Sequence, residues 1–295
     1  MTMTAKRPMW SPEIWETIDQ AILEENRRTE IAAKFLPQYG PMRDALTVPS
    51  DTTLTDSEKR PFFKIDEAAT VPLVEIWVEL VLTPQQVERE MDLKTARTLA
   101  IRATNFLVKG QDTLIFQGQA ATRTPLFTSK RVQFRSGPAG PGLLNEPLPK
   151  DQVVTVRSLE PGKPLWRERT LEAVTEGIAR LKAKGEYGPY ALVLGDLPYG
   201  DAFSPLSGTM ITAADRIVPL MEKGFYGTGT LPAEPVSTGL LVSLEGNTVD
   251  LVVGYDGIVS FLQEDDEGFY RFRVAKRFAL RLKESGAVIK LAFEQ

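Results

Sequence analysis

The stretch LVEIWVELVL, residues Leu73–Leu82, decides the fold class, because three different kinds of segment meet around it. Its apolar residues alternate well enough to predict a long strand with one more polar face, which carries Glu75 and Glu79. The residues before it, 49–72 (PSDTTLTDSEKRPFFKIDEAATVP), are polar with Pro at both ends, which predicts an extended excursion away from the body. Thr83-Pro84-Gln85-Gln86 follows the strand directly and predicts a helix start with a capping box.

The rest of the chain mixes helical and strand patterns without an internal repeat. Helical spacing predicts helices over 12–35, over 171–185, near 212–223, and from residue 92 towards 116, where Gly110 weakens the pattern. Short strands are expected at 190–194, 240–244, 249–253, 259–263, 269–274 and 288–293. The segments 118–164 and 195–235 are rich in Gly and Pro and are expected to be mostly loop. The predicted class is therefore mixed α+β.

Two missing residue types narrow the function more than the composition does. The chain has 295 residues and a net charge of −4, but no Cys and no His. Without them there are no disulfides, no thiolate nucleophiles, no Ser-His-Asp triads and no His-based metal sites. We therefore expect no enzyme, no catalytic residues, no metal and no cofactor. The small net charge argues against a nucleic-acid partner, and no apolar run is long enough to cross a membrane, so we expect a cytoplasmic protein.

A glycine motif in GFYGTGT resembles a nucleotide-binding loop only superficially. Gly224, Gly227 and Gly229 are followed by Pro232 and Pro235, so no helix opens on the last glycine as a dinucleotide site requires. A flexible loop that lines a pore is the interpretation we prefer for these three glycines.

Two charged stretches also have a plain interpretation beside a functional one. Asp265, Asp266 and Glu267 could bind a cation, but three acids at a predicted hairpin tip are usually a solvated turn. A basic stretch that includes Arg131 and Arg135 is interleaved with aromatic residues, as in single-strand nucleic-acid binders. Because the chain is not basic overall, salt bridges between subunits are the better interpretation of that stretch.

The polar segment 49–72 contains apolar residues that it cannot bury by itself. Phe62, Phe63 and Ile65 lie in it, far from any predicted core element. Exposed apolar groups of this kind indicate a contact with another chain. Oligomerisation is therefore expected.

The order of these pieces resembles the encapsulin shell proteins, a linocin-like family related to the major capsid proteins of tailed phages. The resemblance spans nearly the whole chain and lies in element order and short hydrophobic motifs. Four stretches carry it: WETIDQAILEENRRTEIAAKFL (Trp15–Leu36), VPLVEIWVELVLT (Val71–Thr83), DTLIFQG with the later PGLL (Pro141–Leu144), and GPYALVLG (Gly188–Gly195) with the tail that runs from Val249 to Phe293. The segments 118–141 and 195–235 are longer than the family pattern.

The resemblance implies an α+β fold of the HK97-like phage capsid type. It implies a P-domain built from residues 1–48 (the N-terminal helix and arm), 73–145 (with the spine helix) and 245–295 (the closing β-segments). It also implies an extended E-loop at 49–72 and an A-domain at 146–244. The E-loops, with Phe62, Phe63 and Ile65, would contact neighbouring subunits, and Gly224, Gly227 and Gly229 would line the five-fold pore.

The function implied by the resemblance is that of a structural shell subunit of an encapsulin nanocompartment. Copies of the chain would assemble with one another icosahedrally, in sixty copies or a multiple. They would enclose cargo enzymes that bind through C-terminal targeting peptides. The groove for those peptides is expected beside the N-terminal helix, at Ile14, Ile18, Ile22, Val259 and Phe261. Two alternatives stay open: a major capsid protein of a phage or prophage, and, less favoured, an enzyme.

Overall fold

The computed structural model describes residues 10–55, 63–66, 68–135, 140–144, 148–206 and 208–295. Its helices are α1 (Pro12–Thr29), α2 (Ala32–Phe35), α3 (Pro84–Glu88), α4 (Glu90–Leu93), α5 (Thr95–Gln117), α6 (Pro125–Thr128), α7 (Glu168–Ala183), α8 (Asp196–Ala202) and α9 (Ala213–Ile217). Its strands are β1 (Gln38–Tyr39), β2 (Thr47–Pro49), β3 (Thr53–Thr55), β4 (Phe63–Ile65), β5 (Thr70–Pro72), β6 (Val74–Leu82), β7 (Gln133–Phe134), β8 (Val153–Arg157), β9 (Tyr190–Gly195), β10 (Phe225–Thr228), β11 (Ser237–Ser243), β12 (Val249–Glu264), β13 (Tyr270–Leu282) and β14 (Val288–Glu294).

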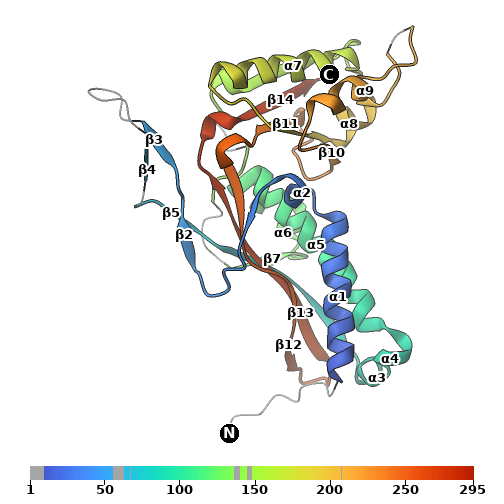
Figure 1. The fold of residues 1–295 in the computed structure, drawn as a ribbon. Coiled ribbons are helices and arrows are strands. Elements are labelled where there is room, and N and C mark those ends of the chain that lie inside the picture. Colours follow the sequence, from blue (N-terminus) through green and yellow to red (C-terminus); the bar gives the residue numbers. More distant parts are fainter. Residues whose placement is uncertain (1–9, 56–62, 67, 136–139, 145–147, 207) are drawn as a thin grey trace.

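The first sheet forms the lower part of the molecule and has the strand order β1-β12-β13-β6-β7. Its centre is the long antiparallel hairpin of β12 and β13, in which Leu251 lies opposite Leu280. β6 pairs antiparallel with the other side of β13 and places Val78 opposite Val274. Helices α1 and α5 lie together over one face of this sheet (Figure 1).

The second sheet lies at the other end of the molecule, with the order β10-β9-β11-β14-β8. Its residues alternate between two apolar clusters, as strand side chains point to opposite faces. Leu192 and Leu241 pack with α7, whereas Val193 and Leu240 join the core that continues into the first sheet. β14 follows β13 along the chain, so one continuous segment serves both sheets.

Helix α1 is held against the first sheet by isoleucines on one of its faces. Ile18 and Ile22 of α1 are fully buried in the main core. α1 begins at Pro12, after Ser11, as expected, but it ends at Thr29, and a separate turn α2 follows. The two are separated because Asp112 of α5 caps α2, accepting hydrogen bonds from the N–H groups of Ile31 (3.0 Å) and Ala32 (3.1 Å).

The spine helix α5 continues through the glycine that weakened its pattern. Gly110 lies in its middle, and a Cβ there would come within 3.2 Å of Val132 Cγ1. The glycine therefore serves close packing against the segment after α6. At the start of the preceding turn α3, Thr83 and Gln86 form the predicted capping box.

The sequence expectation about the length of the closing strands was wrong. The short strands expected at 249–253, 259–263 and 269–274 are parts of the 16-residue β12 and the 13-residue β13. The segments 118–164 and 195–235 lie mostly outside helices and strands, as expected, and the predicted short helix is α9, but they also contain α6, β7 and β8, and α8 and β10, respectively. The elements in these two segments are short, and their contacts with the rest of the fold define them more than the local sequence pattern does.

Candidate functional site: the arm and the groove beside the first helix

An arm of two short antiparallel ladders projects from the body (Figure 1). Near the body β2 pairs with β5, with Val48 opposite Val71, and farther out β3 pairs with β4, with Thr53 opposite Ile65. The base is packed, because Val48 and Val71 are buried against the residues Val252 and Ala279 of the first sheet. The arm corresponds to the segment 49–72 that the sequence sets apart.

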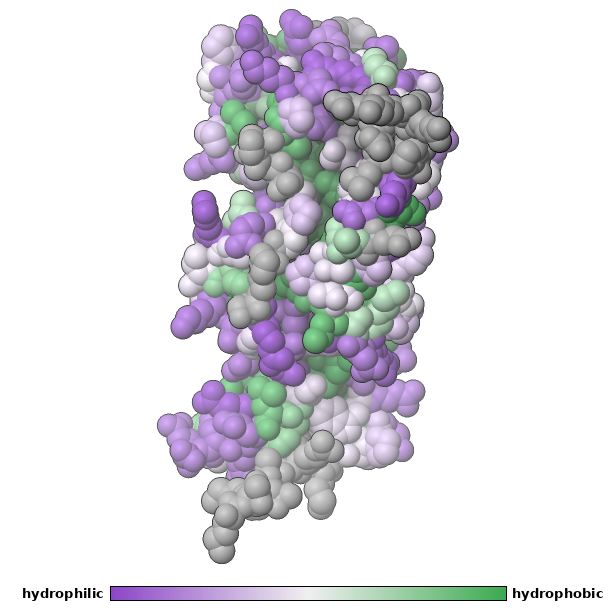
Figure 2. All heavy atoms as spheres, turned by 90° about the vertical axis from the view of Figure 1, so that its left-hand side faces the viewer, coloured by the Kyte–Doolittle hydropathy of each residue, from purple (hydrophilic) through white to green (hydrophobic). Residues whose placement is uncertain are grey.

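The outer ladder offers apolar groups to solvent. Ile65 is 53% exposed. Phe62 lies outside the described residues, and Phe63 belongs to β4 by its backbone while its side chain lies outside the described part. The face of the molecule that carries the arm shows hydrophobic side chains between hydrophilic ones (Figure 2). An isolated two-stranded ladder is only marginally stable in water, so the outer arm needs further contacts to hold its shape.

A groove of about 470 Å³ runs between α1 and the first sheet. Its walls come from one row of α1, from the segment around β1 and from the irregular part of β12. The lining side chains and backbone belong to Asp19, Leu23, Gln38, Tyr39, Gly40, Pro41, Arg43, Val253, Tyr255, Asp256, Gly257 and Ile258. Apolar and aromatic groups with a few charged side chains suit an extended peptide with aliphatic side chains.

Gly257 makes this groove possible. The register of β12 shifts on both sides of Tyr255, and Gly257 has a φ of +68° in the resulting bulge. A Cβ at this position would lie 2.5 Å from Ile22 Cγ2. Only glycine lets the bulged strand approach α1 this closely.

The predicted groove residues are placed differently from this groove. Ile18 and Ile22 are buried between α1 and the sheet, so they hold the helix in place within the subunit. Ile14, Val259 and Phe261 are partly buried against the same core. None of the five lines the groove, which lies on the next row of α1, at Asp19 and Leu23. Sequence reasoning missed Leu23 because it followed the most apolar face of the helix, and that face is used for packing.

A buried ionic cluster fixes the floor of the groove. Lys276 of β13 is only 1% exposed and forms ion pairs with Glu30 and, at 2.8 Å, with Asp256, which also lines the groove. Asn26 of α1 donates to Asp256 and accepts from Lys276. The cluster therefore ties the end of α1 to both central strands of the first sheet.

Burial governs the protonation of the acids around Lys276. It raises the pKa of Glu30, although the adjacent Lys276 ammonium acts in the opposite direction. It also raises the pKa of Asp112 to about 7, against the two N–H groups that Asp112 caps. At the groove, burial together with the nearby Glu75 raises the pKa of Tyr255 to about 12, so this phenol keeps its proton at neutral pH.

The predicted pore glycines lie on the edge strand of the second sheet. Gly227 belongs to β10, paired with Leu194 of β9, while Gly224 precedes that strand with a φ of +103° and Gly229 follows it. The expected flexible loop is thus partly a strand, because it pairs with β9, and Tyr199 packs where a side chain at Gly227 would stand. At the same end of the molecule Met210 is 90% exposed, in the loop between α8 and α9. A pore role for the glycines stays a prediction.

The acidic stretch forms a hairpin turn, as its plain interpretation expects, whereas the ion pair seen in the basic stretch lies within the subunit, so salt bridges between subunits stay a prediction. Asp265 accepts hydrogen bonds from the N–H groups of Glu267 and Phe269 and pairs with Arg271, so it closes the hairpin turn. Arg135 forms an ion pair with Glu75 within the subunit. Among the described residues no group of three or more acidic side chains is placed to hold a metal ion, and no helix is long and apolar enough to span a membrane.

Known proteins with similar sequences include encapsulating and shell proteins. Residues 159–279 match a family model described as an encapsulating protein for peroxidase. The type 1 encapsulin shell protein EncA of Myxococcus xanthus is 24% identical over 307 residues, with 97% of this chain and 94% of that protein covered. The chain is similar to encapsulin shell proteins. The resemblance drawn from the sequence is therefore confirmed, and the relative EncA is described as a shell protein.

Solved structures establish the fold. A virus-like particle protein from Pyrococcus furiosus superimposes with a TM-score of 0.65 at 14% identity, covering 95% of this chain and 99% of that one. The capsid of Myoviridae phage XM1 gives 0.57 at 13% identity (89% and 91% covered), and the SrpI encapsulin of Synechococcus elongatus gives 0.56 at 10% (99% and 91%). The predicted HK97-like capsid fold of the encapsulins and tailed phages is thereby confirmed.

Proposed function

We propose that the chain is the shell subunit of a cytoplasmic encapsulin nanocompartment that closes icosahedrally around cargo enzymes. The observation that carries the proposal is the projecting arm, which buries its base against its own subunit and presents its outer ladder to solvent. Such an arm is useful only when another copy completes it. The encapsulin relatives and the capsid fold support the same function.

We also propose a domain assignment that follows the two sheets. The P-domain takes residues 1–48, 73–145 and 245–287, and the arm 49–72 is the E-loop. The A-domain takes 146–244 and, in addition, 288–295, because β14 lies between β11 and β8 in the second sheet. This last transfer changes the boundary drawn from the sequence, which kept the whole tail in the P-domain.

Assembly is the direct test of this function. Purified protein should elute from gel filtration as a particle with a mass on the order of megadaltons, because a closed icosahedral shell contains many copies of the chain. Electron microscopy should show uniform hollow spheres. A monodisperse monomer or dimer at micromolar concentration would contradict the proposal.

A phage or prophage capsid protein is the second candidate, and the similarity to the capsid of phage XM1 favours it. The contents of the particle separate the two functions. Particles purified from the native host should contain a protein cargo under the encapsulin proposal and DNA under the capsid proposal. Genes for portal and terminase proteins next to the gene would support the capsid.

The cargo peptide, we propose, binds in the groove between α1 and β12. Leu23 and Ile258 offer apolar surface there, and Tyr39 adds an aromatic ring. Burial of an aliphatic side chain contributes about 1.5–3 kcal/mol, so each such contact is weak by itself. Many copies on one inner wall would raise the effective concentration for an oligomeric cargo.

Leu23→Asp should give shells that assemble but contain little cargo. The change places a charge in the groove without touching the buried face of α1. Loss of one aliphatic contact corresponds to roughly a tenfold or greater loss of affinity. Mass spectrometry of particles from a host that expresses the native cargo measures the effect.

Two variants on the same helix make this test specific. Gln20→Asp changes an exposed residue of α1 outside the groove and should leave cargo content unchanged. Ile18→Asp puts a charge into the core and should lower the yield of folded subunit instead. Cargo content equal to wild type in Leu23→Asp particles would move the binding site elsewhere on the shell.

A further inference from the structure

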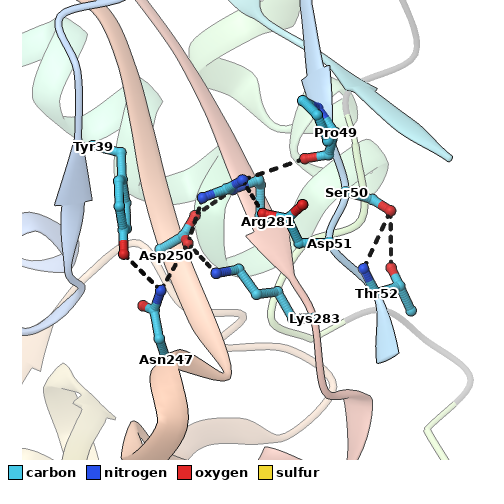
Figure 3. Close-up of polar contacts among 9 residues, drawn as sticks. All are labelled: Tyr39, Pro49, Ser50, Asp51, Thr52, Asn247, Asp250, Arg281 and Lys283. Atoms are coloured by element: carbon cyan, nitrogen blue, oxygen red, sulfur yellow. Dashed lines mark hydrogen bonds and ion pairs between the residues drawn. The ribbon is translucent and has the colours of Figure 1, made fainter. Parts of the chain in front are cut away.

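The base of the arm is joined to the first sheet by a cluster of ion pairs (Figure 3). Arg281 of β13 uses two of its nitrogens, Nε and Nη2, to hold both oxygens of Asp250 at 2.7 and 2.8 Å. Lys283 adds a third contact to Asp250 at 2.7 Å. Asp250 is 0% exposed, and these cations balance its charge from within the body of the subunit.

The remaining nitrogen of Arg281 binds the arm. Its Nη1 lies 2.5 Å from Asp51 Oδ2 and 3.4 Å from the carbonyl oxygen of Pro49. Burial lowers the pKa of Arg281, but the carboxylates of Asp250 and Asp51 outweigh that effect and raise it. The guanidinium is therefore a permanent charge that reaches from the sheet to the arm.

Aromatic and amide groups hold the guanidinium in this position. The centre of the Tyr39 ring lies 5.3 Å from the guanidinium carbon of Arg281 and 5.7 Å from Lys283 Nζ, within the range of cation–π contacts. Asn247 donates hydrogen bonds to the Tyr39 hydroxyl at 2.8 Å and to Asp250 at 3.4 Å. The cluster thus connects β1, β12 and β13 with the arm.

The backbone changes direction at the residue that the cluster holds. Asp51 has a φ of +52°, a left-handed conformation that Asp adopts more readily than most residues. The residues on either side of Asp51 are also bonded, because the hydroxyl of Ser50 accepts hydrogen bonds from Thr52. The N–H of Thr53 donates to the carbonyl of Lys283 at 3.3 Å. The turn between the inner and outer ladders therefore lies on the cluster.

We infer that Asp51 and Arg281 are positioning residues that hold the arm at one angle to the first sheet and so set the curvature at which neighbouring copies join. The second half of this inference rests on the proposed shell function. Under the base, Val48 and Val71 pack with apolar side chains such as Val252 and Ala279, and contacts of this kind are not directional. The forked pair of Arg281 supplies the direction.

Asp51 is the residue at which the joint can be opened without damage to the body. In Asp51→Asn and Asp51→Lys, Arg281 keeps its two bonds to Asp250, so no buried charge is left without a partner. Asn also adopts left-handed backbone, and Lys already does so at Lys94 and Lys130 of this chain. Asp151→Asn is the matched control, since it removes the carboxylate of an ion pair with Lys184 away from the arm.

The arm angle can be measured by spin labels, because the natural chain has no cysteine. Labels at Lys64→Cys on the arm and Arg102→Cys on α5, in subunits diluted among unlabelled copies, report one intramolecular distance. We expect a single narrow distance distribution for the parent and for Asp151→Asn. The two Asp51 variants should lose the narrow peak, and their particles should vary in diameter by electron microscopy.

Each outcome decides one part of the inference. A narrow peak in both Asp51 variants would overturn the positioning role. A lost peak with uniform particles of parental diameter would overturn the link to curvature. If the parent formed no particles at all, the shell function would fail, but the distance distribution would still decide whether Asp51 and Arg281 hold the arm.

Discussion

Subunits with Phe62→Asp together with Phe63→Asp should fold but should no longer form closed shells. The two changes replace by charges two aromatic residues that lie near the exposed Ile65 in the sequence. Each lost aromatic contact with a neighbouring copy costs about 1.5–3 kcal/mol, and the cost repeats at every symmetry-related copy. Gel filtration should show free subunits or small oligomers, with a circular dichroism spectrum like that of the parent.

Lys64→Asp is the matched control for this experiment. Lys64 lies between Phe63 and Ile65. Its replacement by Asp changes the net charge of the arm by the same amount as the double variant, but it removes no apolar group. Its shells should therefore form. Intact particles from the double variant would show that the arm does not lock the subunits together, and loss of shells in the control as well would assign the effect to charge.

Lys276→Met should destabilise the subunit by about 3–5 kcal/mol, the usual cost of removing one partner from a buried ion pair. Lys276 is almost fully buried, and its removal leaves Glu30 next to Asp256 and near Asp112 with no compensating cation. Denaturant unfolding, with all variants at one protein concentration, should show a lower midpoint. The result would also show that α1 depends on this cluster for its position.

Two comparisons separate the lost pair from general damage. The double variant Lys276→Met with Glu30→Leu should recover much of the loss, since apolar replacement of a whole buried pair is often neutral. Lys163→Met removes an exposed pair with Glu160 and should change the midpoint very little. A small effect of Lys276→Met, or no recovery in the double variant, would contradict the role that we assign to the cluster.

The sequence predicted the elements whose signals are local. The capping box at Thr83, the strand that begins near Leu73 and the extended segment 49–72 all follow from residues that are neighbours in the chain. The length of β12 could not be predicted, because Gly254, Gly257 and the polar residues between them interrupt the apolar alternation. The strand continues there only because β13 pairs with it through the bulges.

The residues of the proposed groove and of the proposed arm joint were harder to predict, because they depend on contacts between distant segments. Nothing near Leu23 distinguishes it from its more apolar neighbours on α1 until the β12 bulge lies against that helix. The pairing of Asp51 with Arg281 joins residues 230 positions apart. Resemblance supplied the fold and the shell function, but it could not supply either of these contacts.

The short passage from β13 to β14 gives the subunit a mechanical property. Arg281 anchors the arm one residue before β13 ends, and β14 begins soon afterwards between two strands of the second sheet. A neighbour that pulls on the arm therefore loads β6, which continues the arm along the chain, and also, through the Arg281 ion pair, the segment that leads into the interior of the other sheet. Strain from outside would be shared between the two halves of the subunit instead of opening the seam between them.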